Sequence, residues 1–563
     1  MSTTNEQTVS GEQSRVDIDA AFSKLKEIVG EDHLIVDAAE LEVRSRDTIP
    51  SVKQALAFVY PGNVEEVQAI VRLANEFKIP LWPLSTGRNW GYGGASAARP
   101  GALVVGLYRL DKIIEVNEEM AYAVIEPGVT YRQFNTHIKA IGAKLWTDSI
   151  DGPPNGSVTG NALDRGMGVT DYCDHFGNVC GMEVVLPTGE LMRTGGGKFD
   201  DCKTWNVHKW GTGPYLEGLF TQGNFGIVTK IGIWMMPAPE AFNAFALELH
   251  DDKDLPALVD DLRKLALRRI LAGGCHFYND VVAFAILTQY PPELMASGGN
   301  LSDEMRAKLR AQYGISHWAA GGGTSGTRAQ VRSNRAIIKK TLSRYGRIEF
   351  LDEKKVALVN FALGLVRKAK GSPFWTNALT KLASIATGGK SIEAIEVVPH
   401  LYTVLTGNPS EYFVRHGYFK SPVPKPDSGT DSARDNCGIM WFAPIAPTTG
   451  KNVQELIDLC EPLFKRYGFD FYVASLMQNP RAVIVLMSIM YVKANPEETA
   501  RAQALYNDLA RVTEEAGYQQ YRTSVAYMDR ILDQAPEFKA FANRLKAAAD
   551  PNGIMAPGKY GLG

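Results

Sequence analysis

The stretch Ser85-Thr-Gly-Arg-Asn-Trp-Gly-Tyr-Gly-Gly94 places four glycines within ten residues, directly after the apolar run Leu81–Leu84. Glycine has no Cβ and tolerates positive φ, so the backbone N–H groups of such a loop can converge on one point. Converging N–H groups form a concave site for an anion, and a phosphate is the simplest ligand of that kind. A glycine-rich turn without a ligand would show the same letters, so both interpretations stand at this point.

The segments before the loop predict a strand–helix–strand unit. Ala55–Tyr60 is a short apolar run typical of a buried strand. Asn63 with Glu66 three residues later is a capping box, and apolar residues follow it at helical spacing up to Phe77. The glycine loop therefore follows the second strand of this unit.

Two common nucleotide motifs are excluded. A dinucleotide fingerprint starting at Gly91-x-Gly93 needs a third glycine where Ser96 stands. A P-loop at Gly195–Lys198 needs Ser or Thr where Phe199 stands, because that hydroxyl would hold magnesium. A nucleotide bound by this chain is therefore held by another geometry.

The composition is that of a globular protein with two or more cores. The chain has 563 residues, of which 45% are apolar and 22% charged, and its formal net charge is −2. This balance gives no overall field for nucleic acid or an anionic membrane, and no apolar run approaches the ~18 residues of a spanning helix. The six cysteines are scattered without a Cys-x-x-Cys pair or a Cys/His cluster. We therefore expect reduced thiols, a cytoplasmic location and no metal.

The middle of the chain changes character at Met236-Pro-Ala-Pro239, where we place a domain boundary. Beyond it, amphipathic helices are expected at 251–267 and 496–516, with alternating strands such as 482–491 between them. This mixture is typical of an α+β domain with an antiparallel sheet. We expect Gly321–Gly326 to be a flexible loop before a helix at 327–345, Ser421–Asp435 to be a connector or lid, and residues 1–17 to be a mobile tail.

Several segments together resemble the vanillyl-alcohol oxidase and p-cresol methylhydroxylase family of FAD enzymes. They include Pro-Leu-Trp-Pro-Leu-Ser-Thr-Gly-Arg-Asn-Trp-Gly-Tyr-Gly-Gly (80–94) and Gly-Ser-Val-Thr-Gly-Asn-Ala-Leu-Asp-Arg-Gly (156–166). The other matching runs are 124–131, 172–176, 181–195, 223–234, 521–529 and 550–559. The resemblance implies a two-domain α+β fold. An FAD-binding domain would be formed by residues 1–237 and 519–563, and an antiparallel-sheet cap domain by residues 238–518.

The same resemblance implies FAD as the cofactor, with the glycine loop against its pyrophosphate. The residues assigned to FAD are Ser85, Thr86, Gly87, Arg88, Asn89, Gly91, Tyr92, Pro127, Gly128, Gly156, Ser157, Gly160, Asn161, Gly223, Gly226, Ile227, Val228, Arg522 and Lys559. One position departs from the family pattern. Ile439 stands where many relatives carry a His or Tyr that tethers FAD, and isoleucine has no nucleophilic atom. We therefore expect FAD to be bound without a covalent bond.

Para-substituted phenols are the substrates that the resemblance implies, with Tyr92, Tyr521 and Arg522 holding the phenolate. Ionising a free phenol, whose pKa is about 10, near pH 7 requires about 4 kcal/mol. One hydrogen bond to a charged group supplies about 1.5–3 kcal/mol, so a single donor is marginal and three are sufficient. In a straight strand, Tyr521 and Arg522 would face opposite ways, so a shared role requires a turn or bulge there.

An aspartate near the flavin is implied as the base, and because the segment is one residue longer than usual, both Asp148 and a displaced Asp151 fit this role; Asp151 is favoured. The expected substrate contacts are Tyr172, Trp441 and Arg415, with His416, Tyr418 and Phe442 as further cap-side residues. The electron acceptor is oxygen or an electron-carrier protein, and a homodimer or larger homo-oligomer is expected. Two alternatives stay open: a 2-hydroxy acid or sugar oxidoreductase of the same fold, and a non-catalytic flavin-binding or electron-transfer subunit.

Overall fold

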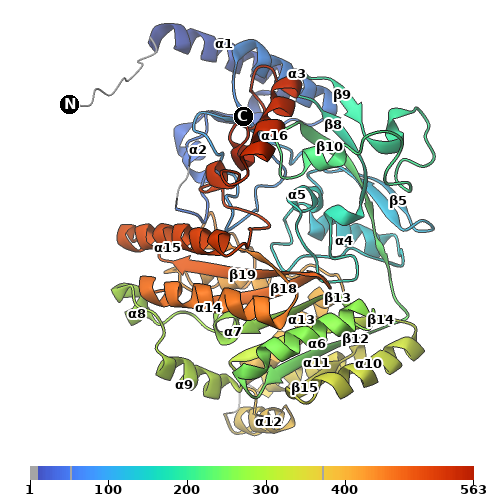
Figure 1. Cartoon of the computed structure of the whole chain (residues 1–563), viewed down its shortest axis with the longest axis vertical. Helices are drawn as coiled ribbons and strands as arrows, with labels where there is room; N and C mark the ends of the chain where they lie inside the picture. The colour runs from blue at the N-terminus through green and yellow to red at the C-terminus, as the bar shows by residue number, and fades with distance from the viewer. Residues whose placement is uncertain (1–10, 51–52, 370–372, 388) are drawn as a thin grey trace.

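Three large β-sheets and a two-stranded sheet of β7 (Leu145–Trp146) and β11 (Met236–Pro237) organise the chain in the computed structural model, which describes residues 11–50, 53–369, 373–387 and 389–563. Two of the large sheets lie in the upper half of Figure 1 and the third crosses the lower half, which gives a two-domain α+β fold. The expected tail at 1–17 is only partly inside the described residues. Residues 11–17 belong to helix α1 (Gly11–Val29).

The first sheet holds the unit predicted around the glycine loop. Its strand order is β1-β2-β4-β3, and β2, β4 and β3 run parallel. The bounds are β1 Leu34–Ile35, β2 Ala57–Val59, β3 Leu81–Leu84 and β4 Leu103–Gly106. Helix α3 (Val64–Phe77) connects β2 to β3, and the Asn63 side chain caps it by accepting the Glu66 N–H at 2.8 Å. The predicted strand–helix–strand unit is confirmed, and the loop leaves the carboxyl end of β3.

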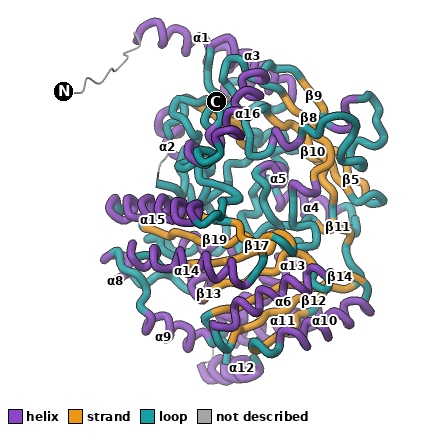
Figure 2. The backbone as a smooth tube through the Cα atoms, in the orientation of Figure 1, coloured by secondary structure: helices purple, strands orange, loops and turns teal. Residues whose placement is uncertain are grey.

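The second sheet is antiparallel, with strand order β5-β6-β10-β8-β9. The bounds are β5 Ile113–Asn117, β6 Tyr122–Ile125, β8 Val179–Val185, β9 Leu191–Arg193 and β10 Ile227–Trp234. Helices α4 (Tyr131–Ala140) and α5 (Val158–Leu163) lie beside it in Figure 2. The apolar sides of α4, α5 and this sheet share one buried core, so the second glycine-rich stretch is fixed against the sheet.

The third sheet is antiparallel and is the central sheet of the cap domain. Its strand order is β15-β12-β14-β13-β18-β19-β16, with β17 also paired to β19. The bounds are β12 Ala241–Leu249, β13 Ala272–Asn279, β14 Trp318–Gly326, β15 Gly346–Leu351, β16 Gly438–Phe442, β17 Ile445–Pro447, β18 Tyr472–Asn479 and β19 Ala482–Tyr491. All these strands lie inside the range predicted for the cap domain.

Helices cover the cap sheet and connect its strands. They are α6 Leu255–Leu267, α7 Asp280–Leu287, α8 Pro292–Ser297, α9 Asp303–Tyr313, α10 Arg328–Leu342, α11 Glu353–Lys368, α12 Pro373–Ala386, α13 Ile392–Leu405, α14 Gly450–Tyr467 and α15 Pro496–Glu515. The helices α6, α14 and α15 bury their apolar sides against the sheet in the largest core of the molecule. The amphipathic helices expected at 251–267 and 496–516 correspond to α6 and α15.

The glycine stretch 321–326 is a strand, not the flexible loop that its composition predicted. It forms most of β14, which pairs with β12 on one side and β13 on the other. A Cβ on Gly322 would lie 2.6 Å from the sulfur of Cys275, and one on Gly323 would lie 2.5 Å from the ring of Phe242. The glycines are required because large side chains from neighbouring strands occupy the space above them.

The C-terminal segment returns to the first sheet. The Leu81 N–H of β3 donates to the Ile554 carbonyl at 2.7 Å, and the Ala556 N–H donates back to the Leu81 carbonyl at 2.8 Å. Lys546, buried on helix α16 (Pro536–Ala549), holds the segment by donating to the carbonyls of Asn224 and Met555, both at 2.7 Å. The C-terminal segment therefore extends the first sheet next to the strand that precedes the glycine loop.

Candidate functional site

A large cavity lies where the glycine loop, α5, the 220–228 segment and the C-terminal segment meet. Its empty volume is about 1260 Å³, open solvent at its mouth included. The cavity has polar groups from Ser85–Asn89 along one part and apolar side chains such as Trp82, Leu107 and Ile227 along another.

The glycine loop has the backbone that its sequence predicted. Gly87, Gly91, Gly93 and Gly94 all have positive φ, which favours glycine over other residues. A Cβ on Gly93 would lie 1.6 Å from the Cγ2 of Val525, so the C-terminal segment packs directly on this glycine. The Val525 N–H also donates to the Tyr92 carbonyl at 2.7 Å. The loop shape is thus set by its glycines and fixed from the other end of the chain.

The residues present fit FAD. The hydroxyl of Thr159 is buried and has no hydrogen-bond partner among the described residues, although Thr159 lines the cavity. Buried polar groups are normally satisfied, so this hydroxyl indicates a polar ligand. The Lys559 ammonium lies 5.9 Å from the Trp82 ring centre and supplies a positive charge in the cavity wall.

Most residues assigned to FAD from the sequence line this cavity. They are Ser85, Thr86, Gly87, Arg88, Asn89, Tyr92, Pro127, Gly156, Ser157, Gly160, Asn161, Gly223, Gly226, Ile227, Val228, Arg522 and Lys559. Gly91 and Gly128 do not line it. The Gly91 N–H donates to the Thr48 hydroxyl, and its missing side chain leaves room for the Trp441 indole. Gly128 lies where a Cβ would touch the carbonyls of Leu107, Tyr108 and Leu110, so its role is close backbone packing.

Tyr92, Tyr521 and Arg522 come together at one side of the cavity, which Tyr92 and Arg522 line. The guanidinium carbon of Arg522 lies 5.0 Å from the Tyr92 ring centre and 5.3 Å from that of Tyr521. Residues 521 and 522 form a bend rather than a strand, so the turn that a shared role required is present. Burial, with Tyr521 close by, raises the pKa of Tyr92 well above its ordinary value, so the Tyr92 hydroxyl stays protonated.

Arg522 is held firmly with part of its donor set unused. Its Nε donates to the Asp164 carbonyl and one terminal nitrogen donates to the Asn89 Oδ1, both at 3.1 Å. The Asn89 amide nitrogen in turn donates to the Asp164 carboxylate at 2.7 Å. The other terminal nitrogen of Arg522 and the Tyr92 hydroxyl are buried without a partner among the described residues. Two donors are therefore available for an anionic oxygen.

An aromatic row extends from Tyr92 into the cap. The Tyr92 and Trp441 rings meet edge to face at 5.5 Å, and Trp441 stacks on His416 at 6.1 Å. The His416 ring lies 6.1 Å from that of Tyr472. The His416 Nδ1 lies 2.6 Å from the Phe413 carbonyl, which can only accept, so Nδ1 carries the proton and Nε2 keeps its lone pair.

Asp151 faces this row. Although the side chain is accessible, the protein around it raises its pKa above the ordinary 3.8 by desolvation, and the nearby His416 opposes the rise. Burial also lowers the pKa of His416 below its ordinary 6.5, against the opposing effects of the Phe413 carbonyl and Asp151. Asp151 and His416 therefore lie close enough for each to affect the pKa of the other.

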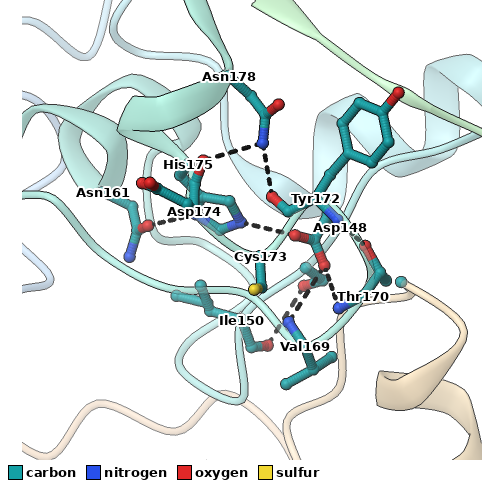
Figure 3. A network of polar contacts seen from close by, with 12 residues as sticks. Asp148, Ile150, Asn161, Val169, Thr170, Tyr172, Cys173, Asp174, His175 and Asn178 are labelled. Carbon is teal, nitrogen blue, oxygen red and sulfur yellow. Dashed lines mark hydrogen bonds and ion pairs between the residues drawn. The ribbon is translucent and has the colours of Figure 1, made fainter. Parts of the chain in front are cut away.

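Asp148, the alternative to Asp151, lies in a separate polar network (Figure 3). Its Oδ1 accepts the N–H groups of Val169 and Thr170 at 3.1 and 2.9 Å, and its Oδ2 lies 3.2 Å from the His175 Nε2. The His175 Nδ1 lies 2.6 Å from the Asn161 Oδ1. Asp148 is thus an anchor behind the cavity wall, linked to it through Asn161.

The remaining predicted contacts are spread more widely. Tyr172 lines a smaller second cavity together with Asp148 and His175, apart from the Tyr92 cluster. The Arg415 guanidinium carbon lies 5.5 Å from the Tyr412 ring centre, and a terminal nitrogen lies 3.8 Å from Asp427. The Tyr418 hydroxyl donates to Asp435 at 2.6 Å, and Phe442 packs on Tyr506 in the cap core. Of the cap-side candidates, Trp441 contacts the Tyr92 ring and His416 contacts Trp441.

The sequence did not single out Asp164, Thr159, Asn224, Val525 or Tyr472. The first four line the cavity, and all four lie inside or next to the runs that carried the family resemblance. Tyr472 lies in β18 and gave no signal, because its role depends on the pairing of the cap sheet. Within the described part of the chain, no group of three or more His, Cys, Asp or Glu side chains could hold a metal ion, and no helix is long and apolar enough to cross a membrane.

Comparison with known proteins agrees with this site. Residues 55–195 match the family model of the FAD binding domain. The chain is 32% identical to 1'-carboxy-chondrochloren decarboxylase of Chondromyces crocatus, over 96% of this chain and 97% of that protein. It is 30% identical to the 4-cresol dehydrogenase [hydroxylating] flavoprotein subunit of Pseudomonas putida, over 96% and 95%.

A solved structure extends the comparison to three dimensions. The 4-ethylphenol oxidase from Gulosibacter chungangensis, in complex with isoeugenol, superimposes with a TM-score of 0.84 at 28% identity, and 99% of each chain is covered. The relatives and this fold agree along the full length of both domains, and the cavity residues fit FAD. The chain belongs to the vanillyl-alcohol oxidase and p-cresol methylhydroxylase family of FAD-dependent oxidoreductases.

Proposed function

We propose that this enzyme oxidises para-substituted phenols at the carbon attached to the ring. The observation that carries the proposal is the Arg522 guanidinium beside the rings of Tyr92 and Tyr521, with unused donors on Arg522 and Tyr92. A cation and a protonated phenol hydroxyl that converge in a buried site are suited to a phenolate oxygen. The names of two relatives, 4-cresol dehydrogenase and 4-ethylphenol oxidase, support the same substrate class.

The donor set is strong enough to ionise a phenol. Ionisation near pH 7 requires about 4 kcal/mol, and a hydrogen bond to a charged group supplies about 1.5–3 kcal/mol. Arg522 is charged at every relevant pH, and the raised pKa of Tyr92 keeps its hydroxyl a donor. Together the two groups reach the required energy, and the Tyr521 hydroxyl is a third candidate donor.

When bound, FAD supplies a two-electron acceptor for the hydride that leaves the benzylic carbon. The phenolate held by Arg522 pushes electrons through the ring as that C–H bond breaks, which leaves a p-quinone methide. Water then adds to the benzylic carbon and gives its proton to a base, or a proton leaves the neighbouring carbon and an alkene forms. Asp151 and His416 are the groups we assign to accept this proton, because His416 Nε2 keeps a lone pair and burial favours its neutral form.

A second reaction follows from the same site and is favoured by the relative that is named a decarboxylase. If the carbon next to the benzylic carbon carries a carboxylate, the quinone methide can lose CO₂. The C–C bond electrons then form the alkene, and the phenolate is restored. A 3-(4-hydroxyphenyl)propanoate would undergo this oxidative decarboxylation, and a 4-alkylphenol would give an alcohol or an alkene.

We also propose that FAD is held without a covalent bond. Ile439 is buried in β16, and its N–H donates to the Thr48 carbonyl at 2.9 Å. Among the described residues that line the cavity there is no His or Cys, and Tyr92 is the only Tyr. Acid precipitation should leave a colourless pellet and a yellow supernatant; a yellow pellet would contradict the proposal.

Anaerobic flavin bleaching tests the proposed function directly. The holoenzyme should be reduced by 4-ethylphenol or 3-(4-hydroxyphenyl)propanoate, and not by D-lactate or a sugar. Reduction by lactate or the sugar alone would favour the alternative oxidoreductase, and no reduction by any of them would favour a non-catalytic flavoprotein. Admission of oxygen afterwards tells an oxidase, whose yellow colour returns within a turnover, from a dehydrogenase, whose colour does not.

A further inference from the structure

Helix α11 exposes a row of apolar side chains. Leu358, Phe361 and Leu365 follow one another at spacings of three and four residues, so they share one side of the helix. All three are exposed, whereas Leu363 and Val366 of the same helix are buried. The helix therefore has two apolar sides, and only one of them is used by the fold.

Helix α12 continues this surface. Phe374, Trp375 and Leu382 are exposed, and Phe374 is 73% accessible. Figure 1 shows α12 at the lower end of the molecule, beyond α11, where it packs on α11 and α13. Six large apolar side chains on two adjacent helices at the tip of a domain are unusual for a surface that meets only water. We call these six residues the tip face.

Lysines frame the tip face. Lys354 and Lys368 continue the α11 row at either end, with the spacing 354, 358, 361, 365 and 368. Lys381 lies next to Leu382 on α12. None of the three lysines has an ion-pair partner among the described residues. Lys355 and Arg367 of α11 pair with Glu349 and Glu396, so the local positive charge rests on Lys354, Lys368 and Lys381.

This charge pattern argues against a second copy of the chain as the occupant. A two-fold contact through the tip face would set the face against itself. Parallel helices would oppose Lys354 to Lys354, and antiparallel helices would oppose Lys354 to Lys368. Both arrangements bring lysines opposite lysines, and Glu353 is the one acid of α11 that could compensate. The occupant is therefore expected to be apolar and anionic.

We propose that the tip face rests on the surface of an anionic lipid bilayer. Phe, Trp and Leu side chains enter the boundary between headgroups and acyl chains, and lysines around them meet the acidic headgroups. Lys354 and Lys368 are about 21 Å apart along α11 at 1.5 Å per residue, so the helix would lie in the plane of the bilayer. No described helix could span a membrane, so the contact is interfacial.

Co-sedimentation of the holoenzyme with vesicles tests this proposal. Vesicles of phosphatidylcholine with 30% phosphatidylglycerol should bind at least tenfold more protein than pure phosphatidylcholine vesicles, and 1 M NaCl should weaken the binding. Phe361→Ser combined with Trp375→Ser should abolish it, and Lys354→Glu with Lys368→Glu should remove the preference for phosphatidylglycerol. Flavin reduction by substrate should be unchanged in both double variants.

The matched control lies on α16, where Phe538 and Phe541 are 63% and 55% exposed. Phe538→Ser with Phe541→Ser removes as much exposed aromatic surface and should leave vesicle binding intact. Equal binding to the two kinds of vesicle, no binding to either, or equal loss in the α16 control would overturn the proposal. So would a dimer, seen by light scattering, that becomes a monomer in the Phe361/Trp375 variant, because the tip face would then be a contact between copies of the chain.

Discussion

The guanidinium of Arg522 lies over the ring of Tyr92, with 5.0 Å between the guanidinium carbon and the ring centre. Tyr92 belongs to the loop whose backbone lines the FAD cavity, and Arg522 belongs to the segment that returns from the cap. This contact joins cofactor binding to the proposed phenolate site. A cation packed on a tyrosine ring also fixes both side chains, so the donors need little reorganisation when a substrate enters.

Removal of the Arg522 charge should therefore impair oxidation more than removal of one hydroxyl. Arg522→Ala should slow flavin reduction by 4-ethylphenol about 10- to 150-fold, because a charged hydrogen bond worth about 1.5–3 kcal/mol is lost and the Asn89 Oδ1 loses its donor. Tyr521→Phe should slow it about tenfold. Anaerobic stopped-flow measurement checks both rates. Tyr527→Phe, at a hydroxyl that contacts Glu514, is the control, and an equal loss there would show a general structural effect.

His416→Gln should slow product formation while flavin reduction stays close to the wild-type rate. Glutamine can accept a hydrogen bond but cannot take a proton, and general-base catalysis typically contributes 10²–10⁴-fold. Burial lowers the pKa of His416 below its ordinary 6.5, so the imidazole is neutral at neutral pH and loses its basic form only as the pH falls. Product formation should therefore decline on the acid side, below about pH 6.5, and rapid-quench analysis measures it. His400→Gln, which alters a histidine stacked on Tyr412, should leave this profile unchanged.

Asp151 and Asp148 should separate into a chemical and a structural role. Asp151→Asn should lower turnover, because Asp151 is one of the two proposed proton acceptors. It should change thermal stability little, because the side chain is accessible. Asp148→Asn should destabilise the fold by about 1.5–3 kcal/mol, because a buried carboxylate that contacts His175 and two backbone N–H groups is replaced. Calorimetry and steady-state kinetics on the two variants check this division. The opposite pattern would make Asp148 the acid of the active site.

Asp47 should make stability depend on pH. Its carboxyl is buried under the glycine loop, and burial raises its pKa from 3.8 to about 7, although Thr48 and Lys493 oppose the rise. The folded protein thus holds a proton that the unfolded chain releases above pH 3.8. The contribution of Asp47 to the free energy of unfolding is therefore most favourable below pH 3.8. It falls by about 4 kcal/mol in total as the pH rises from 3.8 to about 7.

Asp47→Asn removes this titration. The difference in unfolding free energy between wild type and variant should shift in favour of the variant as the pH rises from 4 to 7, and should be constant above pH 7. Chemical denaturation at several pH values measures the difference, which cancels the titrations that both proteins share. A pH-independent difference would mean that Asp47 is ionised in the folded protein throughout this range.

The FAD side of the site could be predicted from the sequence because it depends on interactions between residues that are close in the chain. Asn63 and Glu66 start a helix by their own hydrogen bonds, and the positive φ of the loop glycines follows from the residue type. The substrate half depends on contacts between distant segments. The His416 Nδ1 contacts the Phe413 carbonyl, and the His416 ring stacks on Trp441 of β16. Neither contact leaves a recognisable pattern in the sequence.

The same physical reason explains the expectation that was wrong. Glycines at 321–326 usually mark a flexible segment, but here they make room for Phe242 and Cys275 on the strands beside β14. Conversely, a shared role of Tyr521 and Arg522 requires a turn between them, because neighbouring residues of a straight strand face opposite ways. The structure has a bend at these two residues, which the sequence pattern alone did not indicate.

The return of residues 550–559 to β3 sets the order in which the enzyme becomes active during synthesis. The ribosome makes the glycine loop early, yet Ala556 and Lys559 of the cavity wall emerge only after the whole cap. The nascent chain therefore has an open site at every earlier stage, and FAD can be enclosed only after residue 559 has left the exit tunnel and Lys546 has fastened the segment. Because Ala556 and Lys559 belong to the cavity wall, the complete FAD cavity exists only once the C-terminal segment has been synthesised and has paired with β3.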